Sequence, residues 1–260
     1  MFDLHIHTTY TDGMHFRDII TEAESFGIEA VGLVDHAVVT DDPTLLAHKH
    51  ILAHVFDHTY QLRRNALEEY STNTDVRLYD GIELDYHSSD RDLIAEFLQS
   101  SSFDYTIGSI HYVCGTNIQF SEAFEAHSEE ELDTVVEAYY TQLESLIRSE
   151  LFDIAAHPDL IERNPRTAGR TTPQQADRIA VAFTESDTIP EFNAGDVDSG
   201  SAVNIHPREP LRSRLLERDV SFTYGSDTHN PGEISSRTPV LRQVAEDCDA
   251  TILPPTDICG

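Results

Sequence analysis

The sequence contains a single lysine, Lys49, although it carries 47 acidic residues. Its other basic side chains are arginines, and the formal net charge is -30 at pH 7. This charge argues against a stable complex with nucleic acid, because phosphate backbones repel an acidic surface. An acid excess with almost no lysine also suggests a halophilic protein, since concentrated salt screens the repulsion among its own charges.

Cysteine and long apolar runs are scarce as well. Cys114, Cys248 and Cys259 are an odd number without a C-x-x-C spacing, which predicts neither a disulfide framework nor a zinc knuckle. No apolar run approaches the ~20 residues of a membrane-spanning helix. The first predicted strand begins almost at Met1, which leaves no room for a signal peptide. We therefore expect a cytoplasmic protein with no membrane partner.

Short apolar segments alternate with segments of helical periodicity along the whole chain. The predicted strands are 2–7, 30–34, 76–84, 105–110, 152–156, 189–193 and 220–226. The predicted helices are 18–26, one long helix from Pro43 to Leu67, 93–98, 129–148, 174–183 and 210–217. This alternation predicts an α/β fold with a mainly parallel sheet. With no linker or repeat in 260 residues, we expect one domain, 1–260.

Histidines and acidic residues stand where these strands end. His5 and His7 are one residue apart in an alternating strand, so their imidazoles point to the same face. The polar loop after them ends in Asp12-Gly13 and can return a carboxylate to that face. Similar residues end or follow the other strands: His36, Glu83, His111, His157, Asp227 and His229. Because the carboxyl ends of barrel strands share one rim, these side chains should form one cluster.

The remaining histidines follow no predicted strand. They are His15, His48, His50, His54, His58, His87, His127 and His206. Those from 48 to 58 fall in the predicted long helix, and the others lie in loops or at helix starts. We interpret most of them as solvent-exposed or packing residues, although His15 is close enough to the first motif to be an additional ligand.

Together these motifs resemble the PHP (polymerase and histidinol phosphatase) superfamily. The matching segments are Asp3-x-His5-x-His7 with Asp12-Gly13, Asp35-His36, Gly81–Glu83, Gly108–His111, His157–Leu160 and Gly225–His229. The segments around Glu83, His111 and His157 are most similar to the histidinol-phosphatase branch. The resemblance implies a distorted, TIM-like (βα)7 barrel with its site at the carboxyl ends of the strands. It also implies hydrolysis of a small phosphomonoester.

The resemblance further implies a cluster of two or three divalent metal ions. Its ligand groups, in which Glu83 bridges two ions, are His5, His7, Glu83 and Asp227; Glu83, His111 and His157; and His36, His229 and Asp12. Imidazole and carboxylate ligands suit Zn, Mn or Fe. Asp35 and Asp159 are candidates for orienting imidazoles or for transferring protons.

A phosphorylated substrate needs positive side chains beyond the metals, and arginine suits phosphate through its two-pronged guanidinium. The candidate substrate contacts are Arg163, Arg166, Asn193 and Arg208. One segment departs from the family pattern, because Asp196 and Asp198 stand where a basic residue is usual. These acids would repel a phosphate unless they bind an amino group or face away.

Three functions follow from these features. The first is histidinol-phosphate phosphatase, an enzyme of histidine biosynthesis, which the segments around Glu83 and His111 favour. The second is a PHP phosphoesterase that acts on nucleotides or short oligonucleotides, which the acidic residues Asp196 and Asp198 favour. The third is a metal-free scaffold for binding, against which the complete ligand set argues. The metal and the oligomeric state are open at this point.

Overall fold

A nearly closed barrel of 7 parallel strands forms the centre of the molecule. The computed structural model describes residues 1–197 and 205–260. Within these residues the sheet has eight strands, because β3 pairs with β4 outside the series of seven: β1 (Phe2–His7), β2 (Ala30–Val34), β3 (His36–Val38), β4 (Arg77–Asp85), β5 (Tyr105–Ser109), β8 (Ile154–Ala155), β9 (Ile189–Asn193) and β10 (Thr223–Gly225). Their order is β1-β2-β4-β5-β8-β9-β10, with β3 beside β4. The barrel predicted from the sequence is thereby confirmed.

The last strand returns to the first and brings the two ends of the sheet together. Ile6 and Thr228 form a parallel bridge, and the backbone N–H of His7 donates to the Thr228 carbonyl at 2.9 Å. The N–H of Asp227 donates to the carbonyl of His5 at 2.8 Å. These bonds hold the first and the last histidine motifs of the sequence side by side.

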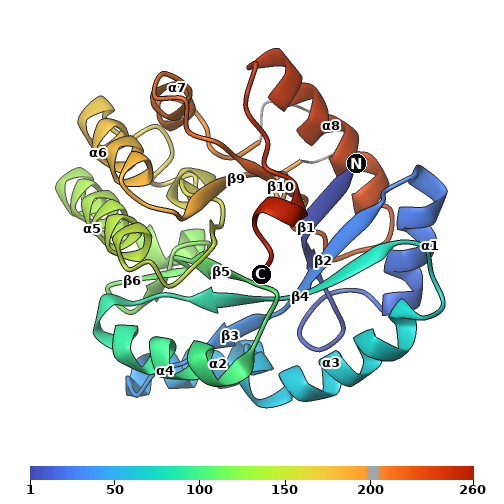
Figure 1. The fold of residues 1–260 in the computed structure, drawn as a ribbon. Helices are drawn as coiled ribbons and strands as arrows, with labels where there is room; N and C mark the ends of the chain where they lie inside the picture. The colour runs from blue at the N-terminus through green and yellow to red at the C-terminus, as the bar shows by residue number, and fades with distance from the viewer. Residues whose placement is uncertain (198–204) are drawn as a thin grey trace.

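Helices surround the barrel (Figure 1). They are α1 (Phe16–Phe26), α2 (Pro43–Leu52), α3 (Phe56–Ser71), α4 (Arg91–Ser101), α5 (Glu129–Arg148), α6 (Pro173–Thr184), α7 (Leu211–Leu216) and α8 (Glu233–Asp247). Helix α5 shows why the sequence predicted most of them. Ser128 and Glu131 cap its first turn reciprocally, and its apolar side chains at helical spacing, such as Leu132 and Leu143, are buried.

Four parts of the secondary structure differ from the prediction. Strand β3, which follows β2 directly after Asp35, was not predicted. The prediction of one long helix after Pro43 is wrong. Ala53 adopts a left-handed conformation (φ 57°) that ends α2, and α3 starts only at Phe56. Helix α8 was not predicted, and its apolar pattern is interrupted by Pro239. The short hairpin of β6 (Tyr112–Val113) and β7 (Thr116–Asn117) was missed as well, because two-residue strands leave no periodicity to detect.

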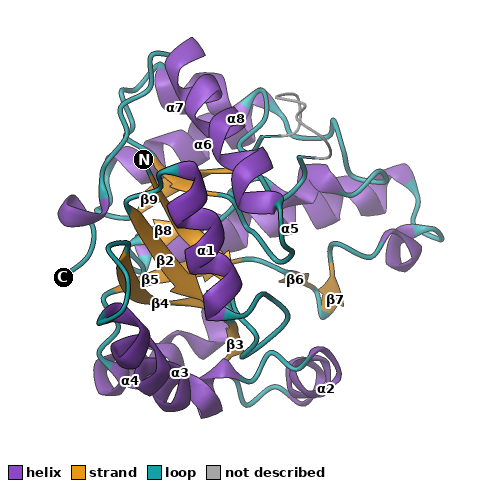
Figure 2. Ribbon diagram, turned by 90° about the vertical axis from the view of Figure 1, so that its right-hand side faces the viewer, coloured by secondary structure: helices purple, strands orange, loops and turns teal. Residues whose placement is uncertain are grey.

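Tyr105 fills the interior of the barrel below the mouth. Its ring packs with Leu4, Val34 and Ile107, all of which are buried. Its hydroxyl donates to the Leu4 carbonyl on the opposite side at 2.6 Å. The barrel is therefore a packed core rather than a channel, and a ligand can enter only at its ends. The β6–β7 hairpin and α2 lie on the side opposite the two termini (Figure 2), which is the side of the strand carboxyl ends.

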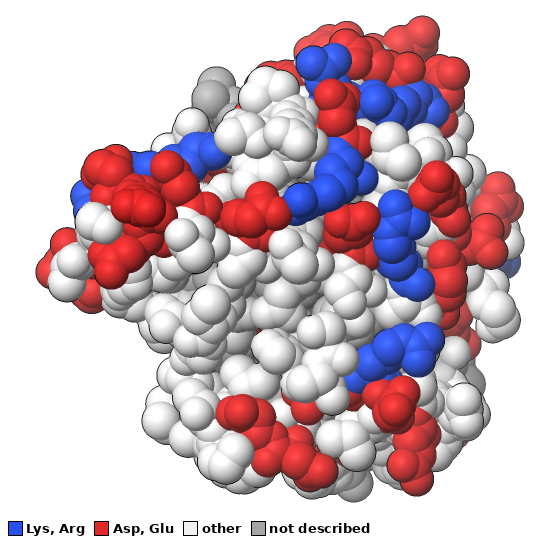
Figure 3. All heavy atoms as spheres, turned by 90° about the vertical axis from the view of Figure 1, so that its left-hand side faces the viewer, with Lys and Arg blue, Asp and Glu red and all other residues white. Residues whose placement is uncertain are grey.

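Acidic side chains dominate the surface. On the face drawn in Figure 3, the arginines lie among carboxylates rather than in a continuous basic patch. Arg148 and Arg178 pair with Glu185 and Glu137, at 2.9 and 2.8 Å. Among the described residues, no helix has both the length and the apolar character to cross a membrane.

We expect the thermal stability of the protein to rise with potassium chloride. The net charge of -30 destabilises the compact state by self-repulsion, and salt near ~1 M shortens the screening length to about 3 Å. Each 1 kcal/mol gained raises Tm by roughly 2–4 °C in a domain of this size. Scanning calorimetry at increasing salt measures the trend. A Tm that is equal at ~0.1 M and ~1 M would contradict it.

Candidate metal centre

His5 and His7 point together into the mouth of the barrel, as their spacing in β1 predicted. Both side chains are fully buried, and their Nε2 atoms lie 3.1 Å apart. The same two nitrogens face Glu83 Oε2 at 3.5 and 3.4 Å. They also face Asp227 Oδ1 at 3.7 and 3.4 Å. Four groups from β1, β4 and the segment after β10 therefore share one small volume.

Glu83 lies between two sets of imidazoles. Its Oε2 faces His5, His7 and also His36, whose Nδ1 is 2.8 Å away. Its Oε1 faces Nε2 of His157 at 3.3 Å and Nε2 of His111 at 3.8 Å. The parallel register of β3 and β4 pairs residues 36 and 83 directly. The two oxygens thus face different groups of nitrogen ligands, which is the arrangement that a bridging carboxylate requires.

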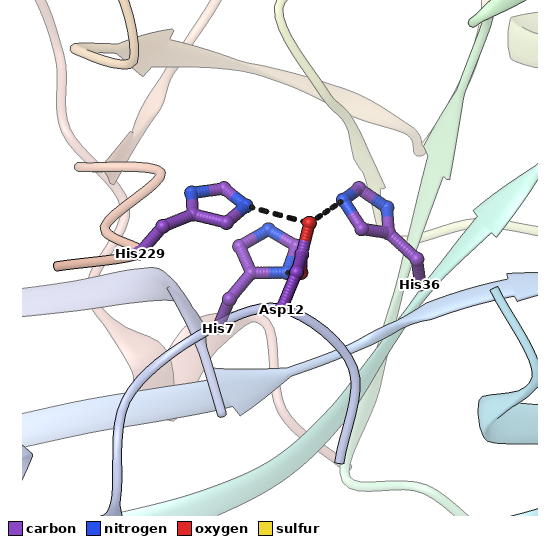
Figure 4. A group of neighbouring side chains, drawn as sticks. All are labelled: His7, Asp12, His36 and His229. Carbon is purple, nitrogen blue, oxygen red and sulfur yellow. Dashed lines mark ion pairs between the residues drawn. The ribbon is translucent and has the colours of Figure 1, made fainter. Parts of the chain in front are cut away.

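A third group forms around Asp12 (Figure 4). Asp12 Oδ2 lies 3.8 Å from His36 Nε2 and 3.6 Å from His229 Nε2, and its Oδ1 lies 3.7 Å from His7 Nδ1. The donor atoms of these four residues all lie within 4.8 Å of one another. The structure therefore brings together every residue that the sequence predicted as a metal ligand.

The loop that carries Asp12 folds back tightly on β1. The N–H of Met14 donates to the His7 carbonyl at 3.1 Å. A Cβ at Gly13 would lie 2.2 Å from the backbone of His7, so only glycine fits at this point. The close approach turns Asp12 toward the imidazoles.

Asp35 holds this loop in place from below. Its carboxylate accepts hydrogen bonds from the hydroxyls of Thr8 and Thr11 at 2.6 and 2.7 Å, and from their backbone N–H groups. The fully buried Arg63 pairs with Asp35 at 2.8 Å and with Asp80 at 2.7 Å. The Asp35 oxygens bond to the loop and to Arg63 and contact no imidazole ring among the described residues, so the structure gives Asp35 the support of the loop rather than either of the two predicted roles.

Two buried carboxylates that sequence reasoning missed orient the imidazoles. Both oxygens of Glu191 lie near His5 Nδ1, at 3.1 and 3.0 Å, and Oε1 also accepts from the N–H of His157 at 3.0 Å. Asp85 Oδ1 lies 2.8 Å from His111 Nδ1. A carboxylate on the far nitrogen of an imidazole fixes the ring for metal binding. Asp85 could have been found, because it follows Glu83 at strand spacing.

His54 is a further histidine of this region. The prediction that it lies within a helix is wrong, because it lies in the turn between α2 and α3 and is buried. Its ring stacks on that of His36, with centroids 4.4 Å apart. Its Nδ1 lies 3.7 Å from Asp85 Oδ2. The left-handed Ala53 makes this turn possible, and no local pattern revealed it.

The buried carboxylates and imidazoles of the site shift one another's pKa values. Burial lowers the pKa of His36, but Glu83 and Asp12 outweigh burial and raise it to about 10. Burial, together with the nearby His229 and His36, lowers the pKa of His7 to about 3, so this imidazole stays neutral. Metals bind neutral imidazoles and ionised carboxylates, so a bound cation would replace the proton that His36 carries at neutral pH, whereas His7 has none to lose.

The donor set fits divalent ions. Glu83 Oε2 is fully buried, and among the described residues no group donates to it with good hydrogen-bond geometry. Two imidazole nitrogens of His5 and His7 face each other across 3.1 Å, an arrangement that a shared cation stabilises. Imidazoles mixed with carboxylates suit Zn, Mn or Fe, whereas an all-oxygen set suits Mg or Ca. The residues gathered here therefore fit divalent metal ions.

The sequence was also compared with models of known protein families. Residues 3–194 match the model of the PHP domain. The chain belongs to the PHP family. The resemblance seen in the sequence motifs is thereby confirmed. Asp227 and His229 lie beyond the matched residues, and the closure of β10 against β1 brings them to the PHP centre.

Known relatives of this PHP protein carry phosphatase names. A protein of Deinococcus radiodurans named "Probable histidinol-phosphatase" is 28% identical and covers 65% of this chain. This chain covers 64% of that relative's length. The structure of histidinol phosphate phosphatase from Lactococcus lactis, complexed with Zn, L-histidinol and phosphate, covers 97% of this chain and is itself covered to 95%. It aligns with a TM-score of 0.73 at 18% identity, which establishes a shared fold.

A second solved structure, from Listeria monocytogenes, has a provisional histidinol-phosphatase name. It covers 90% of this chain and is covered to 97%, with a TM-score of 0.70 at 17% identity. Both structures therefore share the barrel over nearly its whole length.

A cavity of about 240 Å³ opens over the cluster of candidate metal ligands around Glu83 and Asp12. Its walls include the candidate ligands Asp12, His36, His111, His157, Asp227 and His229, and also His54, Asn117, Gln119, Phe120, Leu52, Leu160 and Arg163. Of the four predicted substrate contacts, Arg163 lines this cavity. The β6–β7 hairpin and the turn after α2 supply its outer walls.

Two other predicted substrate contacts, Asn193 and Arg166, form hydrogen bonds with the protein and do not line the cavity. Asn193 donates to Glu191 at 2.7 Å and accepts from the N–H of Gly195 at 2.8 Å. Arg166 donates to the carbonyls of Phe124 and His127, outside the cavity. The structure thus gives these two side chains supporting positions and does not place them where a substrate would bind.

Asp159 and Arg208 belong to a polar network beside the cavity. Asp159 Oδ1 lies 2.6 Å from Nδ1 of His206, and its Oδ2 accepts from the backbone N–H of Arg208 at 2.6 Å. His206, interpreted from the sequence as a solvent-exposed or packing residue, is buried in this network. Asp198 lies outside the described residues. His15 is exposed at the start of α1 and belongs to none of the ligand groups.

Proposed function

We propose that this PHP protein is a metal-dependent phosphatase that hydrolyses L-histidinol phosphate to L-histidinol and phosphate. The observation that carries the proposal is the convergence of imidazoles and carboxylates on both oxygens of Glu83 beneath a cavity. The names of the Deinococcus and Lactococcus relatives support the substrate. A cytoplasmic location in a halophilic cell is part of the same proposal.

The proposed centre holds two or three divalent ions, of Zn, Mn or Fe. The groups on the two oxygens of Glu83 would hold two ions, and Asp12 with His36 and His229 would hold a third. Such ions make water a nucleophile at neutral pH and offset charge on a phosphoryl group.

The side chains of the protein prepare this chemistry. Glu191 and Asp85 fix the rings of His5 and His111, so their ligand nitrogens need no reorganisation. Asp35 and Arg63 hold the loop of Asp12. Arg163 places positive charge on the wall of the cavity, where it can bind phosphoryl oxygens. The apolar Leu52, Phe120 and Leu160 limit the access of bulk water.

Phosphate release from a panel of phosphomonoesters tests the function. We expect histidinol phosphate to be hydrolysed faster than nucleoside monophosphates, a nucleoside 3',5'-bisphosphate and an aryl phosphate. The assay is run in concentrated KCl with Mn, Zn or Fe added. Dialysis against a chelator should abolish the release, and one of the added metals should restore it.

Two results would contradict the proposal in different ways. Preference for a nucleotide would keep the metal chemistry and exclude histidinol phosphate as the main substrate. No release from any ester by protein with two or three bound ions would leave a phosphodiesterase or a binding scaffold instead. Metal content measured on the assayed sample separates this second result from simple loss of metal.

A further inference from the structure

We propose that Asp196 is a positioning residue that aims the guanidinium of Arg163 at the phosphate of the substrate. The inference rests on the proposed function, and it reverses the expectation that an acid at this place repels phosphate. It concerns a carboxylate that lies beside the cavity rather than in the metal centre.

Asp196 is surrounded by positive side chains. Its Oδ1 lies 2.5 Å from Nε of Arg163, and its Oδ2 lies 2.7 Å from Nη2 of Arg208. Nε2 of His206 is 3.4 Å from the same Oδ2. The carboxylate is largely buried, with 14% of its side chain exposed. These contacts neutralise its charge, so it presents little repulsion to an incoming anion.

Two partners of Asp196, His206 and Arg208, are held in place by further contacts. His206 Nδ1 lies 2.6 Å from Asp159 Oδ1, and both side chains are only 1% exposed. Arg208 donates through Nη1 to the Glu162 carbonyl at 2.9 Å and through its backbone N–H to Asp159. Asp196 therefore has a rigid support, whereas Arg163 is 38% exposed and depends on Asp196 for its orientation.

The way in which Arg163 is held favours positioning over competition. Asp196 binds the Nε of Arg163, and Gln119 Oε1, on the cavity wall, lies 3.4 Å from Nη1. A guanidinium has five N–H donors, so two further N–H groups can bind phosphoryl oxygens while Nε stays on the carboxylate. Phosphate does not need to displace Asp196. Losing the carboxylate would release a long, flexible side chain and weaken the contact.

Kinetics of Asp196→Asn test the inference against a matched control. We expect KM for histidinol phosphate, and the inhibition constant of inorganic phosphate, to rise roughly tenfold, the scale of one misplaced charged hydrogen bond. The kcat should change much less. Arg163→Lys keeps the charge but cannot reproduce the Nε contact, and it should give the same rise. Asp177→Asn is the control, because Asp177 also contacts two arginines, Arg214 and Arg218, away from the cavity.

The double variant Asp196→Asn, Arg163→Gln decides between the two roles. If Asp196 acts through Arg163, the double variant should be no worse than Arg163→Gln alone. A lower KM in Asp196→Asn would show that the carboxylate competes with phosphate, and additive losses would show that it acts elsewhere; each overturns the inference. A wild-type protein that releases no phosphate overturns the proposed function instead. Metal content, measured for every variant, should stay at the wild-type value, and the kinetics are recorded well below the Tm of each variant.

Discussion

Glu83→Ala is expected to lower kcat/KM for the phosphate ester by at least about 10³-fold and to reduce the number of bound metal ions. The carboxylate lies between 2.8 and 3.8 Å from five imidazoles, which makes it the shared member of the ligand groups on its two sides. Its replacement removes the bridge and leaves the imidazoles without a central negative charge. Steady-state kinetics and metal analysis on the same sample measure both effects.

Glu162→Ala is the matched control for Glu83→Ala. Glu162 is also a buried carboxylate, but its oxygens bind Thr171 and the N–H of Gly169 in a loop outside the ligand groups. Its variant should keep its metal, and its activity should stay within a few-fold of the wild type. Near-normal turnover of Glu83→Ala with an unchanged metal content would contradict the proposed centre.

Arg63→Ala is expected to lower the free energy of unfolding by about 3–5 kcal/mol. The guanidinium is fully buried between Asp35 and Asp80, and its removal leaves two buried carboxylates without their main positive partner. It also lies over the ring of Phe56, at 4.0 Å from the centroid, so packing is lost as well. Urea unfolding of metal-free protein measures the change. The loop of Asp12, which Asp35 supports, should then bind metal more weakly.

The neighbouring Arg64 provides the control for this variant. Arg64 also pairs with Asp80, at 2.7 Å, but its side chain is partly exposed. Asp80 keeps Arg63 as a partner when Arg64 is removed, and no buried carboxylate is left unpaired, so Arg64→Ala should cost less than Arg63→Ala. Equal losses for the two variants would mean that the buried pair with Asp35 does not support the fold.

The behaviour of Asp196 shows how a sequence departure can be misread. A carboxylate in place of a basic residue suggested repulsion of phosphate, because only its charge was visible in the sequence. The structure surrounds it with Arg163 from one segment of the chain and with His206 and Arg208 from another. Local charge in a sequence therefore says little about local potential when the neighbours are distant along the chain.

The positions of the candidate ligand residues could be predicted because they depend on local rules. Alternation in β1 places His5 and His7 on one face, and the parallel βα pattern places all strand ends on one rim. The regular helices followed from apolar periodicity and end signals, as in α5 with its cap at Ser128. These features involve neighbours within a few residues of each other, and a sequence contains that information directly.

The sequence alone thus determined the barrel and the predicted ligands at its mouth, while the tertiary structure decided what supports them. Glu191 reaches His5 across 186 positions of the chain, and Arg63 reaches Asp35 across 28. His54 enters the cavity through a left-handed turn at Ala53. Such contacts depend on how separate elements pack. No local periodicity encodes them, because the hydrogen-bonding groups become neighbours only when the barrel closes.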